Sequence, residues 1–249
     1  SWLDGEMKFL HGKNGEIVAK WECPGEPQDL GKEAFKLSPV LRTAIEQTGY
    51  KGREVGLVLD HCKLTQQLLS TPPAHGRDLE LYLQRQVDQL KVVDESVIMS
   101  WMETEPIKTS KGLVLYLFPK ALQEKLITEC KDAGLHLTIL VAPTVLLRSE
   151  LAKLSIKDGE IALIAAQSGR STAVVIGRNN GELFLARSLR CNWTDSKARL
   201  NSELNRSTIF LRQQYGRDVN AIFLTGEGAD TQAEQIRLGA VVNGGPSCA

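Results

Sequence analysis

Three runs of strand-forming residues follow one another between residues 160 and 190, and short polar turns separate them. The runs are Ile161–Ala166, Thr172–Ile176 and Glu182–Leu189. The second turn ends in Asn180 and Gly181, a pair that supplies the positive φ angles of tight hairpins. The pattern therefore predicts a three-stranded meander over this stretch.

A long helix and a further strand are predicted after the meander. Thr194 or Asp195 caps the start of the helix, and Gly216 ends it. Asn220–Leu224 then reads as a strand that leads into a glycine-bearing loop and a short helix near residues 231–238. Helical spacing places five residues on one face of the long helix: Leu200, Leu204, Thr208, Leu211 and Tyr215.

The first 60 residues alternate between strand and helix patterns. Met7–Leu10 and Ile17–Trp21 predict a hairpin around an Asn-Gly turn. Ser38, followed by proline, is expected to be the N-cap of a helix that ends at Gly49. The continuous apolar run Val55–Leu59 predicts a strand that is buried on both faces.

Residues 62–141 predict the order strand, helix, strand, strand, helix, strand, which is the ferredoxin-like βαββαβ order. Asp78 is expected to cap the first helix, and the second begins at Pro119 and ends at Gly134. The polar stretch Glu103–Lys111 reads as a solvated loop between the two middle strands. The predicted strands are Leu64–Leu69, Ser96–Met102, Leu113–Phe118 and Leu135–Val141. A short helix at Pro143–Lys153 then leads to the meander.

Composition excludes several classes of function. Lys and Arg total 30, as do Asp and Glu, and aromatic residues are 6% of the chain, so we expect no nucleic-acid partner. The longest apolar run, Leu137–Leu147, is shorter than the roughly 20 residues of a membrane span. The five cysteines lack CxxC spacing, which favours free thiols in a reducing cytoplasm.

Two short strings carry residue types that are used in catalysis or in nucleotide binding. Asp60, His61 and Cys62 are adjacent, but successive residues at a strand end point to different faces, so they do not form a triad. The other histidines have no companion at metal-ligand spacing, and no metal site is expected. Gly226 and Gly228 are compatible with a simple turn or with the remnant of a nucleotide loop.

Four short strings follow one another along the chain: Lys131-Asp132-Ala133-Gly134-Leu135, Gly181-Glu182-Leu183 through Arg187, Glu203 with Arg206 and Ser207, and Leu224-Thr225-Gly226-Glu227-Gly228. Their order and spacing resemble the pilus-assembly family PilM, which is related to the division protein FtsA and to the cytoplasmic domain of the secretion protein GspL. This resemblance implies an α/β, actin-like (RNase H-like) fold in two parts with an inserted ferredoxin-like subdomain. The first part would comprise residues 1–61 and 142–157, the insert 62–141, and the second part 158–249.

The resemblance also locates a nucleotide site, and this chain departs from it. Family members that bind ATP carry Asp-x-Gly in the first turn of each half, where the carboxylate holds hydrated magnesium. The second-half triplet aligns with Gln167, Ser168 and Gly169, and the first-half triplet would fall at Ser1–Leu3, ahead of a matching Lys8. We therefore expect no catalytic residue, no cofactor and no ATP hydrolysis. The vestigial loop residues are Lys8, Gln167, Ser168, Gly169, Gly226, Glu227 and Gly228.

The function implied by the resemblance is assembly of a type IV pilus or type II secretion machine. The chain would lie in the cytoplasm, would meet the inner membrane only through partners, and would dock the tail of a PilN-like bitopic protein. The expected docking groove lies where Val55–Leu69 meets Leu113–Phe118 and Pro143–Leu147. Other inner-membrane components of the machine are further expected partners, and a homodimer stays open. The alternatives are an actin-like ATPase that binds Mg-ATP and an FtsA-like division scaffold.

Overall fold

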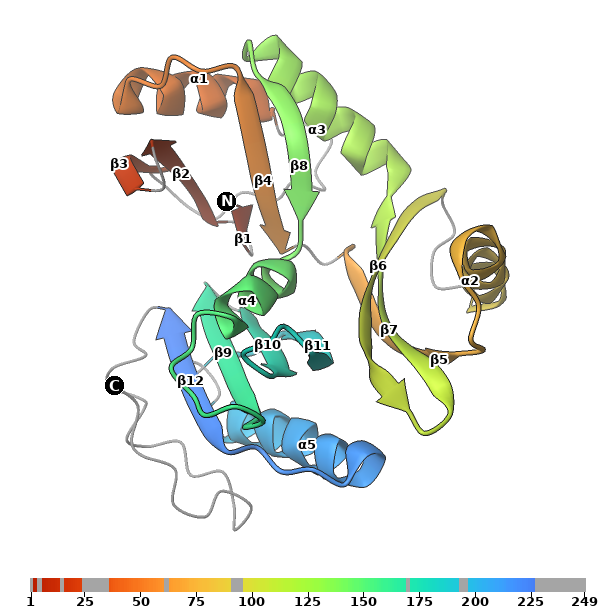
Figure 1. The fold of residues 1–249 in the computed structure, drawn as a ribbon. Coiled ribbons are helices and arrows are strands. Elements are labelled where there is room, and N and C mark those ends of the chain that lie inside the picture. The colour runs from red at the N-terminus through yellow and green to blue at the C-terminus, as the bar shows by residue number, and fades with distance from the viewer. Residues whose placement is uncertain are drawn as a thin grey trace.

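The computed structural model of the 249-residue chain describes residues 2–3, 6–13, 16–23, 36–60, 63–90, 96–168, 171–192 and 197–226. In this part of the chain the strands form three sheets, with orders β3-β2-β1-β4-β8, β11-β10-β9-β12 and β5-β7-β6. Figure 1 shows the five-stranded and four-stranded sheets one above the other, with the three-stranded sheet beside them. None of the described helices combines the length and apolar character that crossing a membrane requires.

The five-stranded sheet is covered by helices on one face. Helices α1 (Leu37–Thr48) and α3 (Lys120–Asp132) pack on that face (Figure 1), in a core that also holds Met7, Phe9 and Leu59. β1 runs parallel to β4 and antiparallel to β2, and β8 runs parallel to β4. The strands are β1 (Trp2–Leu3), β2 (Glu6–Lys13), β3 (Glu16–Glu22), β4 (Glu54–Asp60) and β8 (His136–Val141). The predicted hairpin at residues 7–21 is confirmed as β2 and β3.

Two predictions for this sheet are wrong. Ser38 lies inside the first turn of α1, whose N-cap is Lys36, and the Ser38 N–H donates to Oε2 of Glu129 at 2.8 Å. A carboxylate from α3 therefore takes the role expected of the serine hydroxyl. β4 is not buried on both faces, because Glu54 and Gly56 are exposed on the side away from the helices. The predicted helix end is confirmed, since Gly49 has φ 64°.

The three-stranded sheet comprises β5 (Thr65–Thr71), β6 (Val97–Ile107) and β7 (Ser110–Pro119), and α2 (Gly76–Leu90) packs on one face. Asp78 lies in the first turn of α2 and does not precede it. The stretch Glu103–Lys111 is not a loop: it continues both strands, and only two residues separate them. The polar side chains of this stretch are compatible with two paired strands, because several positions near the tip of the hairpin are exposed to solvent.

The predicted ferredoxin-like subdomain is corrected by the sheet topology. Its predicted last strand, β8, pairs with β4 in the five-stranded sheet, and its predicted last helix, α3, packs on that sheet. Leu137 and Leu140 of β8 pack against the core beneath α1 and α3, and this burial places the strand there. The insert is therefore βαββ. Pro119 ends β7 and is the N-cap of α3, which begins at Lys120, one position after the predicted start at Pro119.

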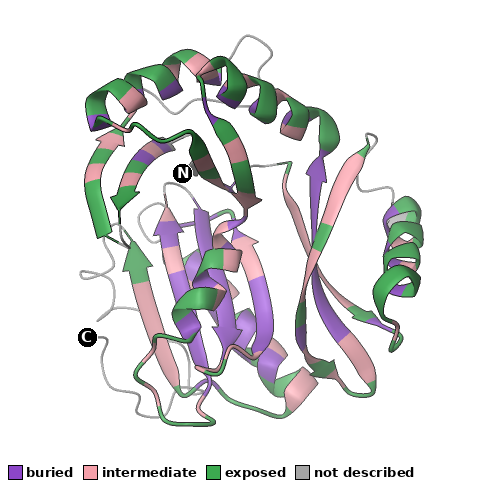
Figure 2. Cartoon of the chain, turned by 45° about the horizontal axis from the view of Figure 1, so that its top comes forward, coloured by how far each residue is buried: buried purple, intermediate pink, exposed green. Residues whose placement is uncertain are grey.

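The predicted meander is confirmed as β9 (Ala162–Ser168), β10 (Ser171–Gly177) and β11 (Leu183–Leu189). β12 (Ala221–Gly226) joins this sheet parallel to β9. Helix α5 (Lys197–Tyr215) covers one face of the sheet and α4 (Pro143–Leu151) the other. Figure 2 shows the resulting contrast: the inner strands of this sheet are buried, while those of the five-stranded sheet carry many exposed positions. The predicted caps Thr194 and Asp195 and the short helix at residues 231–238 lie outside the described residues.

Candidate functional site

The ends of β9 and β12 meet at the edge of the four-stranded sheet. Gln167 and Gly226 are register partners on these parallel strands, and Gln167 is buried. Gly226 has φ 102°, and a Cβ built there would lie 2.1 Å from the main-chain oxygen of Gln167. Glycine is therefore required at this position both by its backbone conformation and by the close approach of the neighbouring strand.

The structure brings only some of the predicted loop residues together. Ser168 ends β9 beside Gln167, and its main-chain oxygen lies 3.3 Å from the Ser171 hydroxyl oxygen. Lys8 lies in the five-stranded sheet, where its ammonium group is 3.6 Å from the carboxylate of Glu22. The residues of this predicted set that lie outside the described part of the chain are Gly169, Glu227 and Gly228.

The connection between the first two strands comes later in the sequence than the predicted first-half triplet at Ser1–Leu3. Trp2 and Leu3 form β1, and Leu3 is the register partner of Glu6 on β2. The residues between these strands are Asp4 and Gly5, which themselves lie outside the described part of the chain. The sequence that connects β1 to β2 therefore contains an acidic residue, whereas the predicted triplet at Ser1–Leu3 contains none.

Asp60 connects the two large sheets. It ends β4, is 2% exposed, and accepts a hydrogen bond from the hydroxyl of Ser171 at the start of β10. Its second oxygen lies 3.9 Å from a terminal nitrogen of Arg190, which follows β11. A buried carboxylate needs such partners, because desolvation is costly for an unpaired charge. We call this contact between Asp60, Ser171 and Arg190 the inter-sheet latch.

A groove lies where the three-stranded sheet meets the five-stranded sheet. Its volume is ≈ 370 Å³, and its lining includes the ends of β4 and β8, the first half of β6, part of β7 and the start of α4. This is the junction at which the docking groove was predicted, although β6 was not expected to form a wall. The apolar lining includes Leu59, Leu64, Ile98, Met102, Phe118 and Val145.

A small polar group sits at the side of this groove. The hydroxyl groups of Tyr116 and Thr144 are 3.0 Å apart, and the Gln66 amide donates to Thr144 Oγ1 at 3.1 Å. Burial raises the pKa of Tyr116 to about 12, while the Thr144 hydrogen bond and the charge of Arg148 oppose the rise. The phenol therefore stays neutral near pH 7, and the groove wall is uncharged at this point.

No protein-family model matches this sequence, and no curated protein matches it. The structure is similar to that of a PilM–PilN type IV pilus biogenesis complex, with a TM-score of 0.74 and 14% identity over 94% of this chain and 82% of that one. It is also similar to the cytoplasmic domain of EpsL, an inner-membrane component of the type II secretion system of Vibrio cholerae. That match has a TM-score of 0.56 and 18% identity over 90% of this chain and 78% of that one.

A third solved structure, from Bacteroides thetaiotaomicron, is of a protein with an actin-like ATPase fold and unknown function. It matches with a TM-score of 0.50 and 12% identity over 94% of this chain and 81% of that one. The chain has the actin-like ATPase fold. At these identities the matches concern the fold alone.

The described residues of the predicted second-half loop, Gln167, Ser168 and Gly226, offer magnesium no carboxylate ligand. The position expected to carry the acidic ligand is Gln167, and a neutral amide does not offset the charge of Mg²⁺. The buried carboxylate nearby, Asp60, is held by Ser171 and Arg190. The described residues contain no group of three or more His, Cys, Asp or Glu side chains arranged to hold a metal ion.

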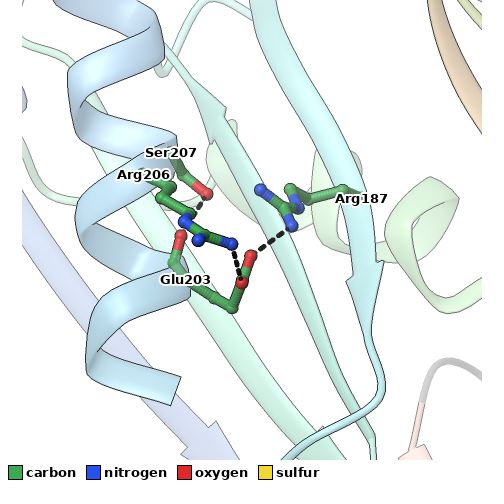
Figure 3. Close-up of polar contacts among 4 residues, drawn as sticks. All are labelled: Arg187, Glu203, Arg206 and Ser207. Atoms are coloured by element: carbon green, nitrogen blue, oxygen red, sulfur yellow. Dashed lines mark hydrogen bonds and ion pairs between the residues drawn. The ribbon is translucent and has the colours of Figure 1, made fainter. Parts of the chain in front are cut away.

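A second polar cluster links α5 to the meander of the actin-like fold (Figure 3). Glu203 accepts from Arg187 at 2.7 Å and from Arg206 at 2.6 Å. The Ser207 hydroxyl donates to the main-chain oxygen of Glu203 at 3.0 Å. These motif residues, on which the PilM resemblance partly rested, thus bind one another and join α5 to β11.

The sequence analysis missed the role of Asp60, which was considered only as a member of a catalytic triad and rejected. A signal was present, because an acidic residue directly follows a predicted apolar strand, and ligands of open α/β sheets gather at the carboxyl ends of strands. The partners of Asp60 could not be found in this way. Ser171 lies 111 positions further along the chain, and only the packing of the two halves brings them into contact.

Proposed function

We propose that this protein is an assembly component of a type IV pilus or type II secretion machine. In this proposal it docks the cytoplasmic tail of a PilN-like inner-membrane protein, stays in the cytoplasm, and reaches the membrane only through that partner and its neighbours. The support is its likeness in fold to PilM in a complex with PilN, and to the cytoplasmic domain of EpsL. The observation that carries the proposal is the groove of ≈ 370 Å³ between the two sheets.

The chemistry of the groove suits a short extended peptide. Its lining is largely apolar, and such surfaces bind peptides through pockets for alternate side chains. β6 and β8 are edge strands of their sheets among the described residues, and both contribute to the lining. An edge strand offers unpaired main-chain groups, so a bound tail can add hydrogen bonds to its apolar contacts.

Trp101 lines the groove and provides a direct reporter. Titration with a synthetic PilN-like tail is expected to shift the tryptophan emission, and Trp101→Phe is expected to abolish that shift without abolishing binding. Val145→Glu places a charge on the groove wall and is expected to weaken binding at least about tenfold, since burial of an unpaired charge is costly.

Leu146→Glu is the matched control for the groove variant. Leu146 is the next residue on α4, is 44% exposed and does not line the groove, so this variant is expected to bind the tail as the parent does. If the parent and Val145→Glu bind the tail equally well, the groove is not the docking site. If no PilN-like tail binds to the parent, the proposed function is wrong.

The second candidate function is binding of Mg-ATP in the actin-like cleft. Asp60 favours it, because its buried carboxylate contacts Ser171 at the start of β10, and Asp4, which follows β1 in the sequence, is a further acidic residue. Against it stand Gln167 and the engagement of Asp60 by Ser171. We infer that the chain does not hydrolyse ATP. Calorimetric titration with Mg-ATP, with a phosphate-release assay, decides between the two: saturable binding with turnover supports the enzyme, and a flat titration supports the scaffold.

A further inference from the structure

The face of the three-stranded sheet that lies away from α2 carries one polar row of side chains between two apolar rows. Register pairs of β6 and β7 define these rows, because the side chains of directly opposite residues lie on the same face of a sheet. The polar row contains Ser100 and Tyr116, and Gln66 of β5 is the register partner of Tyr116 on its other side. The apolar rows contain the pairs Ile98 with Phe118 and Met102 with Val114.

The docking groove follows β6 across all three rows. Its lining includes Ile98, Ser100 and Met102 of β6, with Tyr116 and Phe118 of β7. Neighbouring rows are two residues apart along each strand, a distance of about 6.6 Å at 3.3 Å per residue. Alternate side chains of an extended peptide have the same spacing. A peptide that lies along β6 therefore presents the successive side chains of one face to an apolar, a polar and an apolar row.

The polar row holds one hydrogen-bond donor that is not used. The Gln66 amide donates to Thr144 Oγ1 at 3.1 Å, and one further hydrogen bond joins the hydroxyl groups of Thr144 and Tyr116. Two hydroxyl protons are available for that single contact, so one of them has no acceptor among the described residues. With the Gln66 amide turned over, the unused donor would instead be an N–H group of Gln66.

Tyr116 is the member of this group that can reach a ligand. Its side chain lines the groove and is 5% exposed, whereas Thr144 is 0% exposed and Gln66 does not line the groove. When Thr144 donates to Tyr116, hydrogen bonds run from Gln66 through Thr144 to the phenol, whose own O–H then needs an acceptor in the groove. Burial raises the pKa of Tyr116 to about 12, so the phenol keeps this proton near pH 7.

We propose that the docking groove selects a tail in which an uncharged hydrogen-bond acceptor, such as the carboxamide of Asn or Gln, lies between two apolar side chains at alternate positions. This inference rests on the function proposed above and specifies the chemistry of the partner. The acceptor binds the Tyr116 O–H, and the apolar side chains lie on the two apolar rows. An apolar side chain at the central position leaves the phenol without an acceptor, and a carboxylate there loses its hydration in a largely apolar groove.

A series of synthetic peptides that differ at one position tests the proposal. Each has the sequence Lys-Leu-Lys-Z-Lys-Leu-Lys with blocked ends and a fluorescent label, and Z is Asn, Leu or Asp. Binding to the parent chain is measured by fluorescence anisotropy. The Asn peptide is expected to bind at least about threefold more tightly than the Leu peptide and about tenfold more tightly than the Asp peptide. A parent chain that prefers the Leu or the Asp peptide contradicts the proposal.

Three variants assign the preference to the phenol. Tyr116→Phe is expected to shift the ratio of the Asn and Leu dissociation constants about tenfold toward Leu. Thr144→Val removes the donor behind Tyr116 without touching the peptide, and a shift of about threefold in the same direction is expected. Tyr82→Phe is the matched control, since Tyr82 packs beside α2 in another cluster and does not line the groove. The ratio is measured within one variant, so it does not depend on the fraction of folded chain.

Two results overturn the proposal. An unchanged ratio in Tyr116→Phe would show that the unused donor is not the phenol, and would place it on Gln66. Failure of every peptide in the series to bind to the parent would show that the groove does not recognise the pattern. Neither result decides the proposed function, because that function is tested separately by the PilN-like tail and by Val145→Glu. The proposed function fails only if the tail itself does not bind to the parent.

Discussion

The four-stranded and five-stranded sheets are built on different principles. All seven residues of β10 are buried, and clusters of apolar side chains lie on both faces of its sheet. β3 of the five-stranded sheet has no buried residue, and that sheet is covered by α1 and α3 on one face (Figure 2). The first sheet is thus a closed core, and the second is an open layer.

This difference indicates that the two sheets are stabilised by different contacts. The four-stranded sheet is covered on both faces, by α5 and by α4, and this packing holds β9 and β12 in place. The five-stranded sheet gains stability from contacts outside it: α1 and α3 on one face, the inter-sheet latch at Asp60 and the insert beside it. The docking groove lies beside β8, which is an edge strand of this sheet among the described residues.

The largest effect is expected when one charge is placed on each of the two sheets. Ile176 on β10 is 0% exposed, and Ile139 on β8 is 57% exposed. Ile176→Asp is expected to cost about 4 kcal/mol or more and to prevent stable folding, because it buries an unpaired carboxylate. Ile139→Asp is expected to change the free energy of unfolding by less than about 0.5 kcal/mol. Urea denaturation followed by circular dichroism measures both, and similar losses would contradict the contrast.

Gly226→Ala tests the close approach of β12 to β9. The new Cβ would meet the Gln167 main-chain oxygen, and φ 102° is strained for alanine, so a loss of about 3 kcal/mol is expected. Gly181→Ala is the control, since Gly181 has φ 86° with no atom within 4 Å of an added Cβ. It is expected to cost about 1 kcal/mol, which isolates the backbone strain. Equal losses in thermal or urea unfolding would show that the contact with Gln167 is unimportant.

The two sheets also differ in how far the sequence predicted them. The meander was predicted correctly because each strand is short, rich in β-formers and followed by a turn signal such as Asn180-Gly181. Such signals are local, and they suffice when consecutive strands pair with each other. Gly216, with φ 62°, likewise ends α5 as its type predicts.

The errors concern pairings between segments that are distant in the chain. The pattern of residues 135–141 predicts a strand, but nothing in it tells whether the strand joins the insert or pairs with β4. β1 is two residues long, too short for any periodic pattern, so the position of the first turn was misjudged. The N-terminus of α1 was misassigned because Glu129 on another helix, and not Ser38, accepts the exposed N–H group.

The third test concerns the inter-sheet latch. It measures the coupling energy between Asp60 of the five-stranded sheet and Ser171 of the four-stranded sheet. Asp60→Asn and Ser171→Ala, alone and combined, form a double-mutant cycle in urea unfolding. A coupling energy of about 1.5–3 kcal/mol is expected, because the hydrogen bond involves a buried charge. Thr43→Ala, combined with Asp60→Asn, serves as the control pair, since Thr43 bonds only within α1 at Pro39. Additive effects in the first cycle would show that the two sheets are held together by packing alone.

The smallest expected effect concerns the helices that cover the open layer. Burial raises the pKa of the Glu129 carboxyl, but hydrogen bonds from Ser38 and from the Leu37 N–H, with the charge of Lys125, outweigh it and leave the pKa below its ordinary value. A carboxyl group with a lowered pKa stabilises the fold when ionised. This contribution is present above the unfolded-state pKa of about 4.3 and is lost as the pH falls through the folded-state value.

Glu129→Gln is therefore expected to lower the free energy of unfolding by about 1 kcal/mol at pH 7, since the amide keeps an acceptor for Ser38 but lacks the charge. The difference from the parent should shrink below about pH 4.3 and vanish in strong acid, because the parent carboxyl is then neutral as well. Glu124→Gln, on the exposed side of the same helix, controls for loss of surface charge and is expected to stay within about 0.5 kcal/mol at every pH. A difference between Glu129→Gln and the parent that does not change with pH would assign the effect to packing, and α1 would then be held on the open layer by its apolar face alone.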